Sequence, residues 1–290
     1  MNVLQLGLPS GSLEQATFEL LRKAGWKIAT SARSYFPSVD DDALRCMLVR
    51  AQEISRYVEH GSLDAGITGL DWTLENGSDV VVVADLLYSK GSLLPTRWVL
   101  AVQHDSPIAR LEDLQGKTVA TELVNFTRRY FEARNIKVSV DFSWGATEAK
   151  AAEGLVDAIV DVTETGSTIR AHGLRIIETL ATSNPQLIAN RQAYAEPWKR
   201  AKIDQLAMLL KGALEAETRV GLKMNVARAD IDRIIGMLPS ITAPTVADLY
   251  GKAWLSVEIV VAERQVRELI PDLIKAGAIG IIEYPLNKVV

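Results

Sequence analysis

The sequence predicts an α/β protein whose carboxyl end forms a separate, smaller α/β domain. Two observations predict it. Short apolar segments alternate with amphipathic segments up to about residue 174, and near residue 200 this order changes. Strands that alternate with helices favour a mostly parallel sheet covered on both faces. With 290 residues, the chain is long enough for two domains, or for three if one is small.

The first predicted strand, residues 3–8, is an apolar run that stops at a Pro-Ser-Gly-Ser turn. An amphipathic helix follows over 13–24, and Gly25 ends it. The same apolar spacing and the same turn residues define the later elements. Further strands are expected at 46–49, 65–68, 80–86, 97–102, 118–121, 138–142 and 158–162. Further helices are expected at 51–59, 72–76, 126–135 and 146–153, and another opens after the turn at 163–167.

The last third of the chain has a different order of elements. One long helix is expected over 197–214. After it come strand 220–226, helix 230–238, strands 245–249 and 254–261, helix 263–276 and strand 279–284. This β-α-β-β-α-β order is the ferredoxin-like arrangement, so we expect a separate domain at 216–290.

Composition excludes several classes of protein. Hydrophobic residues make up 48% and charged residues 23%, as in ordinary globular proteins. A net charge of −4 argues against a general nucleic-acid partner. We see neither a signal peptide nor a membrane segment, so a cytoplasmic protein is expected. Cys46 is the single cysteine, and the three histidines lack metal-ligand spacing.

The most informative segment follows the strand at 158–162. Asp161 stands at the strand end, where its carboxylate can accept hydrogen bonds from vicinal sugar hydroxyls. The following turn is small and rich in hydroxyls, and its amides can wrap a phosphate. The turn comprises Thr163, Glu164, Thr165, Gly166, Ser167 and Thr168. Together these groups suit a 5-phosphorylated ribose. A plain helix cap remains the alternative, because Asp, Ser and Thr are preferred caps.

Three other loops follow predicted strands. Ser10 and Ser12 stand where a helix cap is also expected. Gly66 and Gly69 indicate either tight packing or close approach of a ligand. Arginines 128 and 129 lie within a predicted helix, where paired arginines usually form a solvated face.

Six segments of the chain are distinctive: LGLPSGSLEQAT (6–17), LDAGITGLDW (63–72), TVATELVNFTRRYF (118–131), WGATEAK (144–150), GLVDAIVDVTETGSTIRAHGL (154–174) and AIGIIEYPLNKVV (278–290). Together they resemble the ATP phosphoribosyltransferase family in its long, feedback-regulated form. They occur in order over essentially the whole chain.

The resemblance implies a fold and a reaction. The fold is a two-lobed catalytic part like type II periplasmic binding proteins, followed by the ferredoxin-like domain. Lobe I would comprise 1–97 with 179–215, lobe II 98–178, and the regulatory domain 216–290. The reaction transfers the 5-phosphoribosyl group of phosphoribosyl pyrophosphate (PRPP) to N1 of ATP and releases pyrophosphate. This is the first step of L-histidine biosynthesis, and histidine inhibits it. The resemblance also implies Mg²⁺ held mainly by substrate oxygens, and a homo-oligomer, dimer or hexamer.

The resemblance also assigns roles to residues. Asp161 and Glu148 would be catalytic and hold the ribose hydroxyls. The PRPP loop would be Asp161 with Thr163, Glu164, Thr165, Gly166, Ser167 and Thr168. The ATP and pyrophosphate side would be Pro9, Ser10, Gly11, Ser12, Arg50, Gly69 and Asp71. The histidine site would be Asn225, Thr245 and Gly280. The family commonly has Pro-Lys-Gly-Arg or Pro-Lys-Gly-Ser in the first loop, whereas this chain has Pro-Ser-Gly-Ser and no cation there.

Two other functions fit parts of the pattern. A two-lobed α/β chain also suits a small-molecule binding or regulatory protein without catalysis, and the missing first-loop cation favours it. The second is a phosphoribosyltransferase of another kind. Those enzymes usually have two adjacent acidic residues before the loop, and this counts against the second function because here Val162 follows Asp161.

Overall fold

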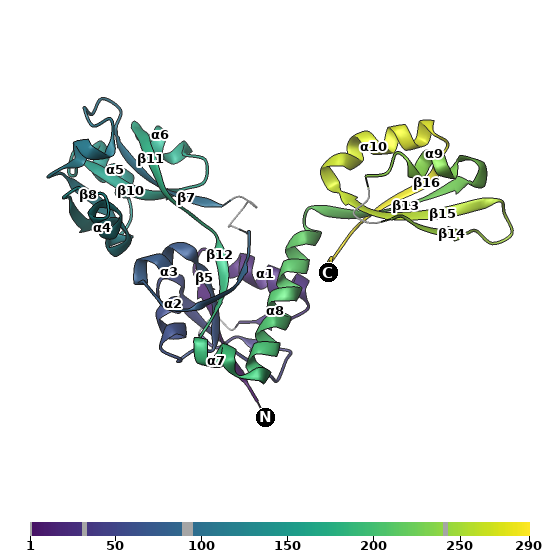
Figure 1. Ribbon diagram of the computed structural model, residues 1–290, viewed down its shortest axis with the longest axis horizontal. Coiled ribbons are helices and arrows are strands. Elements are labelled where there is room, and N and C mark those ends of the chain that lie inside the picture. The colour runs from purple at the N-terminus through teal and green to yellow at the C-terminus, as the bar shows by residue number, and fades with distance from the viewer. Residues whose placement is uncertain (1, 31–33, 89–94, 240–242) are drawn as a thin grey trace. The chain divides into compact units, whose positions relative to one another are not determined.

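The computed structural model describes residues 2–30, 34–88, 95–239 and 243–290. The chain divides into two compact units, Met1–Arg22 with Trp26–Ala207, and Lys23–Gly25 with Met208–Val290. The first unit contains two five-stranded sheets and the second contains a four-stranded sheet. Figure 1 shows the elements of each unit.

The first sheet, with its helices, forms lobe I. Its strand order is β4 (Leu44–Arg50), β1 (Leu4–Ser10), β5 (Ala65–Gly69), β12 (Pro185–Ala189) and β6 (Val81–Asp85). The helices that follow its strands are α1 (Glu14–Ala24), α2 (Ala51–Glu59) and α3 (Leu70–Asn76). A Cβ atom at Gly66 would lie 2.5 Å from Ile54 Cγ2, and one at Gly7 would lie 2.6 Å from Leu63 Cδ1. Gly66 therefore serves close packing against α2.

The second sheet forms lobe II. Its order is β11 (Leu174–Ser183), β7 (Thr96–Gln103), β10 (Ala158–Thr163), β8 (Thr118–Thr121) and β9 (Ser139–Phe142). The lobe also contains α4 (Val124–Glu132), α5 (Thr147–Ala152), α6 (Ser167–Ala171) and a 3-10 turn at Leu111–Leu114. Trp98 and Leu100 pack into the core on one face, and Val99 and Ala101 pack on the other. Burial on both faces explains why β7 is almost continuously apolar.

The expectation of mostly parallel sheets is wrong in this first unit. In each sheet two of the four strand pairs are parallel and two are antiparallel. The sequence analysis assigned no strands to β11 and β12. Two register shifts in β11 break its alternation, and β12 is only five residues long and begins at Pro185. The return to lobe I that we expected near Glu178 lies inside β11, and the chain changes sheets across Asn184.

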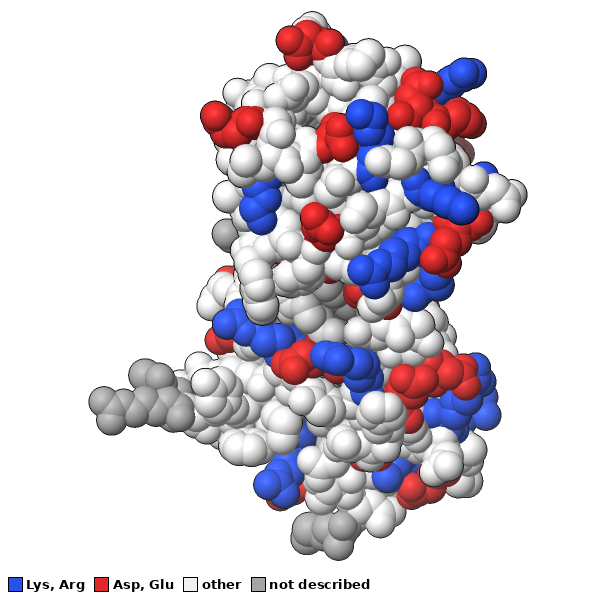
Figure 2. Space-filling model, turned by 90° about the vertical axis from the view of Figure 1, so that its left-hand side faces the viewer, with Lys and Arg blue, Asp and Glu red and all other residues white. Residues whose placement is uncertain are grey.

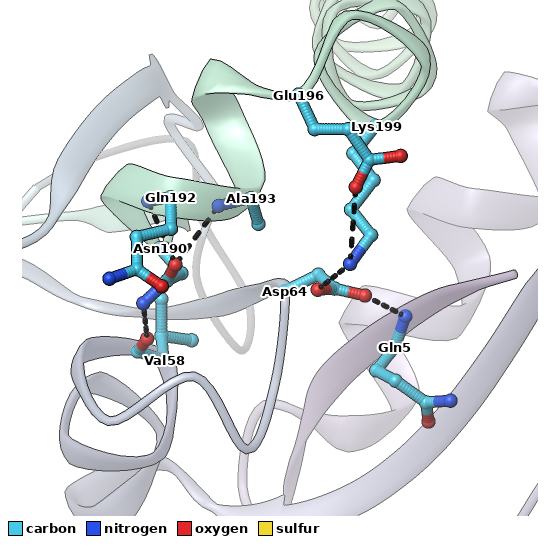
Figure 3. A network of polar contacts seen from close by, with 8 residues as sticks. All are labelled: Gln5, Val58, Asp64, Asn190, Gln192, Ala193, Glu196 and Lys199. Carbon is cyan, nitrogen blue, oxygen red and sulfur yellow. Dashed lines mark hydrogen bonds and ion pairs between the residues drawn. The ribbon is translucent and has the colours of Figure 1, made fainter.

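Helix α8 (Pro197–Ala216) is fastened to lobe I by the polar network in Figure 3. Lys199 Nζ lies 2.8 Å from Asp64 Oδ1, and the Gln5 amide donates to Asp64 Oδ2 at 2.8 Å. Nearby, Asn190 donates to the Val58 carbonyl at 2.9 Å, and its Oδ1 caps the short helix α7 (Arg191–Ala195). These bonds satisfy buried polar atoms where the helix begins.

The second unit has the β-α-β-β-α-β order that the sequence predicts. Its sheet order is β14 (Thr245–Asp248), β15 (Trp254–Ala262), β13 (Arg219–Ala227) and β16 (Ile279–Pro285), with every neighbouring pair antiparallel. Helices α9 (Ile231–Ile235) and α10 (Glu263–Lys275) cover one face (Figure 1). Buried and half-buried residues alternate along β15, which places its apolar side chains under these helices. The ferredoxin-like arrangement is confirmed.

We expect Asp64→Ala to lower the free energy of unfolding of the first unit by about 1–3 kcal/mol, because the substitution removes the acceptor of the Gln5 amide and leaves Lys199 only its longer ion pair with Glu196. Urea denaturation measures the loss. Asp79→Ala is the matched control, because it removes an exposed partner of Arg191 and should change stability little. Equal losses in the two variants would contradict a special role for Asp64.

Candidate functional site

A cavity of about 340 Å³ is lined by both lobes of the first unit. Its walls come from the carboxyl ends of strands: β1, β4 and β5 in lobe I, and β8 and β10 in lobe II. Ligands in α/β sheets bind at such strand ends. The lining residues discussed below are Ser10, Ser12, Arg50, Gly69, Asp71, Trp98, Glu122, Glu164, Ser183 and Asn184.

Arg50, at the end of strand β4, places a cation beside the Pro9–Ser12 turn. Ser10 is paired with Arg50 in the parallel register of β1 and β4. Gly11 has φ +95°, and a Cβ atom there would lie 3.3 Å from Arg50 Nη1. The guanidinium therefore lies against the Pro9–Ser12 turn. The charge that the loop itself lacks stands beside it in space.

Asp71 is a buried carboxylate that joins the lobes. Its Oδ2 accepts from the Trp98 indole at 2.8 Å and its Oδ1 from the Trp72 amide at 3.0 Å, while its own amide donates to Ser183 Oγ. A Cβ atom at Gly69 would lie 2.0 Å from Asp71 Oδ1, so Gly69 makes room for this carboxylate. Burial raises the pKa of Asp71 despite these hydrogen bonds. Asp71 lines the cavity as expected, but both of its oxygens have protein donors.

Helix α3 also holds α4 of lobe II through contacts that the sequence analysis missed. Glu75, only 8% exposed, accepts from the amides of Asn125 at 3.0 Å and Phe126 at 2.8 Å. A carboxylate at a helix N-terminus is favourable for the free amides and for the helix dipole. Arg129 donates to the Leu74 carbonyl and Arg128 to the Val140 carbonyl. The two arginines thus hold backbone in place, rather than forming only a solvated face.

The hydroxyl-rich turn of lobe II is compact. The Gly166 amide donates to Thr163 Oγ1 at 2.8 Å, and Thr165 and Ser167 hydroxyls lie 3.0 Å apart. Gly166 has φ +76°, and a Cβ atom there would lie 2.9 Å from Arg170 Nη1. Thr165, Ser167 and Thr168 are exposed at the start of α6, and Glu164 lines the cavity.

Asp161 lies at the end of β10 beside other carboxylates. Burial raises its pKa to about 6, a hydrogen bond from the Val162 amide opposes this shift, and the charges of Glu148 and Glu122 add to it. Glu148 lies in the first turn of α5, which follows two residues of positive φ, Gly145 and Ala146. The structure therefore brings the two predicted catalytic carboxylates together.

The sequence analysis did not single out Glu122, which lines the cavity from the end of β8. Burial raises the pKa of Glu122, and the charge of Asp71 adds to the shift. The signal was its position: it follows a strand parallel to β10, so its side chain reaches the same edge of the sheet as Asp161.

The residues predicted for a histidine site lie on the sheet of the second unit. Gly280 has φ +60°, and a Cβ atom there would lie 3.3 Å from Asn225 Nδ2, so these two residues are neighbours. Thr245 is exposed on edge strand β14, which two strands separate from β16. Within one chain, the structure therefore brings together two of the three.

Among the described residues, no group of three His, Cys, Asp or Glu side chains could hold a metal ion. In the same part of the chain, every helix is too short or too polar to span a membrane. On the face drawn in Figure 2, acidic and basic side chains are intermingled.

Family comparisons match nearly the whole chain. The family described as ATP phosphoribosyltransferase matches residues 50–212, and the one described as HisG, C-terminal domain, matches residues 216–288. The chain is 60% identical over 288 residues to an ATP phosphoribosyltransferase of Desulfosudis oleivorans, covering 99% of each chain. It is 62% identical over 289 residues to one of Solidesulfovibrio magneticus, covering 100% of this chain and 99% of that one.

Solved structures resemble most of the chain in fold. An ATP phosphoribosyl transferase (HisG:HisZ) complex from Thermotoga maritima aligns with TM-score 0.62 and 25% identity, over 72% of this chain and 99% of that one. A structure described as Tv2483 bound to L-arginine aligns with TM-score 0.50 and 14% identity, over 74% and 86% of the two chains. The second likeness shows the two-lobed fold alone.

Because Asp161 is partly buried beside other carboxylates, we expect its pKa to lie above the usual value for aspartate. We expect NMR of side-chain carboxyl carbons to show a pKa near 6 in the unliganded protein. Glu148→Gln should lower this pKa, because it removes a negative charge that disfavours ionisation. Glu153→Gln, on the residue that follows α5, is the control and should leave it unchanged. A pKa near 4 in the unchanged protein would contradict the arrangement.

Proposed function

The chain belongs to the ATP phosphoribosyltransferase family, and from that premise we propose that its reaction takes place in the cavity between the two lobes. The reaction is the transfer of the 5-phosphoribosyl group of PRPP to N1 of ATP with release of pyrophosphate, the first step of histidine biosynthesis. The observation that carries the assignment of the site is that Arg50 of lobe I and Glu122 and Glu164 of lobe II line one cavity, and that Asp161 stands next to the lining residue Val162 on β10.

PRPP is assigned to lobe II. Thr165, Ser167 and Thr168, which are exposed at the start of α6, would bind its 5-phosphate through their amides and hydroxyls. Gly166 is buried, and its amide donates to Thr163 Oγ1, so it would shape this turn. Asp161, with Glu148, would accept hydrogen bonds from the ribose hydroxyls. Donors from the sugar would also stabilise the ionised carboxylate of Asp161 against burial, and against the neighbouring charges that add to its raised pKa.

The nucleotide and the pyrophosphate are assigned to the lobe I side. Arg50 lies against the Pro9–Ser12 turn and would neutralise phosphate charge there. Ser10 and Ser12 line the same wall and would add hydroxyl donors. Gly69 and Asp71 would act indirectly, because the Asp71 carboxylate already accepts from Trp98 and Trp72.

Catalysis needs no covalent nucleophile on the protein. N1 of adenine attacks C1 of the ribose as the C1–O bond to pyrophosphate breaks, with oxocarbenium character at the ribose, as in other glycosyl transfers. The carboxylates would stabilise this positive charge, and the two binding walls would align N1 with C1. Lining by both lobes restricts the access of water, which would otherwise compete as nucleophile.

The family is generally metal-dependent, and we propose Mg²⁺ as the metal. Mg²⁺ commonly binds one or two carboxylates together with substrate phosphates and water, so it needs no enclosing set of protein ligands. Because Asp161 and Glu148 would hold the ribose hydroxyls, Mg²⁺ would be held mainly by substrate oxygens and water. Bound Mg²⁺ would supply charge neutralisation of the leaving pyrophosphate.

The second unit is proposed as a histidine sensor that acts through assembly. The Thermotoga maritima relative is described as a complex, which supports an oligomeric enzyme. Among the described strands, β14 stands at an edge of its sheet, and such edges favour association between copies. Asn225 and Gly280 of one chain with Thr245 of another would complete a histidine site in a dimer or hexamer. A cytoplasmic location is part of the same proposal.

Asp161→Ala tests the PRPP site. We expect kcat/KM for PRPP to fall about 10- to 100-fold, because a charge-assisted hydrogen bond to the substrate is worth about 1.5–3 kcal/mol. Thr165→Ala should also lower it, and both variants should unfold at unchanged urea concentration. Pyrophosphate release from ATP and PRPP measures the activity. If the unchanged protein binds PRPP but releases no pyrophosphate, the chain is a binding protein and the catalytic proposal fails.

Asn225→Ala tests the histidine site. We expect at least about a tenfold higher histidine concentration for half-inhibition, with kcat unchanged, because a hydrogen bond to a charged group of the ligand is lost. Lys223→Ala is the control, two residues away on the same strand and exposed. Insensitivity of the unchanged enzyme to millimolar histidine, with no binding by calorimetry, would rule out the sensor.

A further inference from the structure

Glu122 lines the cavity, and its carboxylate has no donor among the described residues. It lines the cavity from the end of β8 and is half-buried. Within residues 2–30, 34–88, 95–239 and 243–290, no hydrogen bond or ion pair reaches it, whereas Asp71 accepts on both oxygens and Asp161 accepts from the Val162 amide. A half-buried carboxylate without donors is costly, so a ligand that brings a donor to Glu122 gains free energy.

Glu122 lies between the two halves of the site. The negative charge of Glu122 adds to the raised pKa of Asp161 in lobe II, and the charge of Asp71 in lobe I adds to the raised pKa of Glu122. The proposed reaction brings N1 of adenine to the ribose that Asp161 holds. The part of ATP nearest Glu122 is then the edge of the base that carries N1 and the N6 amino group.

A carboxylate suits that edge better than a donor side chain would. N1 must keep its lone pair free to attack C1, and a donor at this place would compete for that lone pair. A carboxylate has no proton to donate and can accept only from the N6 amino group. We propose that Glu122 accepts a hydrogen bond from N6 of ATP and thereby selects adenine, an inference that rests on the function proposed above.

The same bond would strengthen during the reaction. As the C1–N1 bond forms, the C1–O bond to pyrophosphate breaks, and its electron pair leaves with the pyrophosphate. The adenine ring gains positive charge, which spreads to N6 and makes its N–H a stronger donor. The proton stays on N6. An interaction that is stronger in the transition state than in the bound substrate raises kcat.

The test compares ATP with purine riboside triphosphate, which has N1 but no N6 amino group. We expect Glu122→Gln to lower kcat/KM for ATP about 10-fold and Glu122→Ala about 100-fold, with changes below about threefold for the analogue. Where turnover of the analogue is too slow, its inhibition constant against ATP gives the same comparison. Glu112→Gln, an exposed residue outside the cavity, is the matched control. Circular dichroism and thermal unfolding check that the variants fold.

The outcomes separate this proposal from the one on which it rests. Equal losses with ATP and the analogue would overturn adenine recognition, because they would place the effect of Glu122 on the ribose or on the fold. A shift in the Mg²⁺ concentration for half-activation, without a change in base preference, would overturn it in favour of a metal ligand. No pyrophosphate release by the unchanged protein would instead refute the proposed function itself.

Discussion

Two carboxylates on one short helix hold lobe II against lobe I. Asp71 accepts a hydrogen bond from the Trp98 indole, and Glu75 accepts from the amides of Asn125 and Phe126 at the start of α4. The seven-residue helix α3 therefore contacts both β7 and α4 of the other lobe. Both carboxylates are at most 8% exposed, and therefore they need these donors to avoid a large desolvation cost. The cavity exists because these contacts fix the distance between the strand ends that line it.

The site concentrates negative charge in a chain whose net charge is only −4. Burial raises the pKa of Asp161 to about 6, and the crowding of the Glu148 and Glu122 charges around it adds to this shift. Such crowding is unfavourable in the empty protein and becomes favourable when positive charge develops among the carboxylates. A reaction with an oxocarbenium-like transition state supplies that charge, whereas the polyphosphates need the opposite wall, where Arg50 stands.

Local patterns in the sequence predicted most elements, because apolar periodicity and turn residues mark them directly. The order of the C-terminal domain and the end of α1 at Gly25 are examples. Antiparallel pairing of β12 was not predictable, because it depends on where the chain re-enters a sheet formed much earlier. The site shows the same limit. Arg50 and Gly11 are brought together only by the register of β1 and β4. The hydrogen bond from the Trp98 indole to Asp71 is a long-range contact that no local spacing reveals.

The single residue between β11 and β12 has a mechanical consequence. Asn184 is confined to extended conformations because Pro185 follows it. Its carbonyl accepts from the Leu70 amide, and its side chain donates to Asp85. This connection therefore has little torsional freedom and is stiffer than a flexible hinge. Relative motion of the lobes here must be spread as small elastic bends over both strands, and the stored strain tends to restore the original geometry after each displacement.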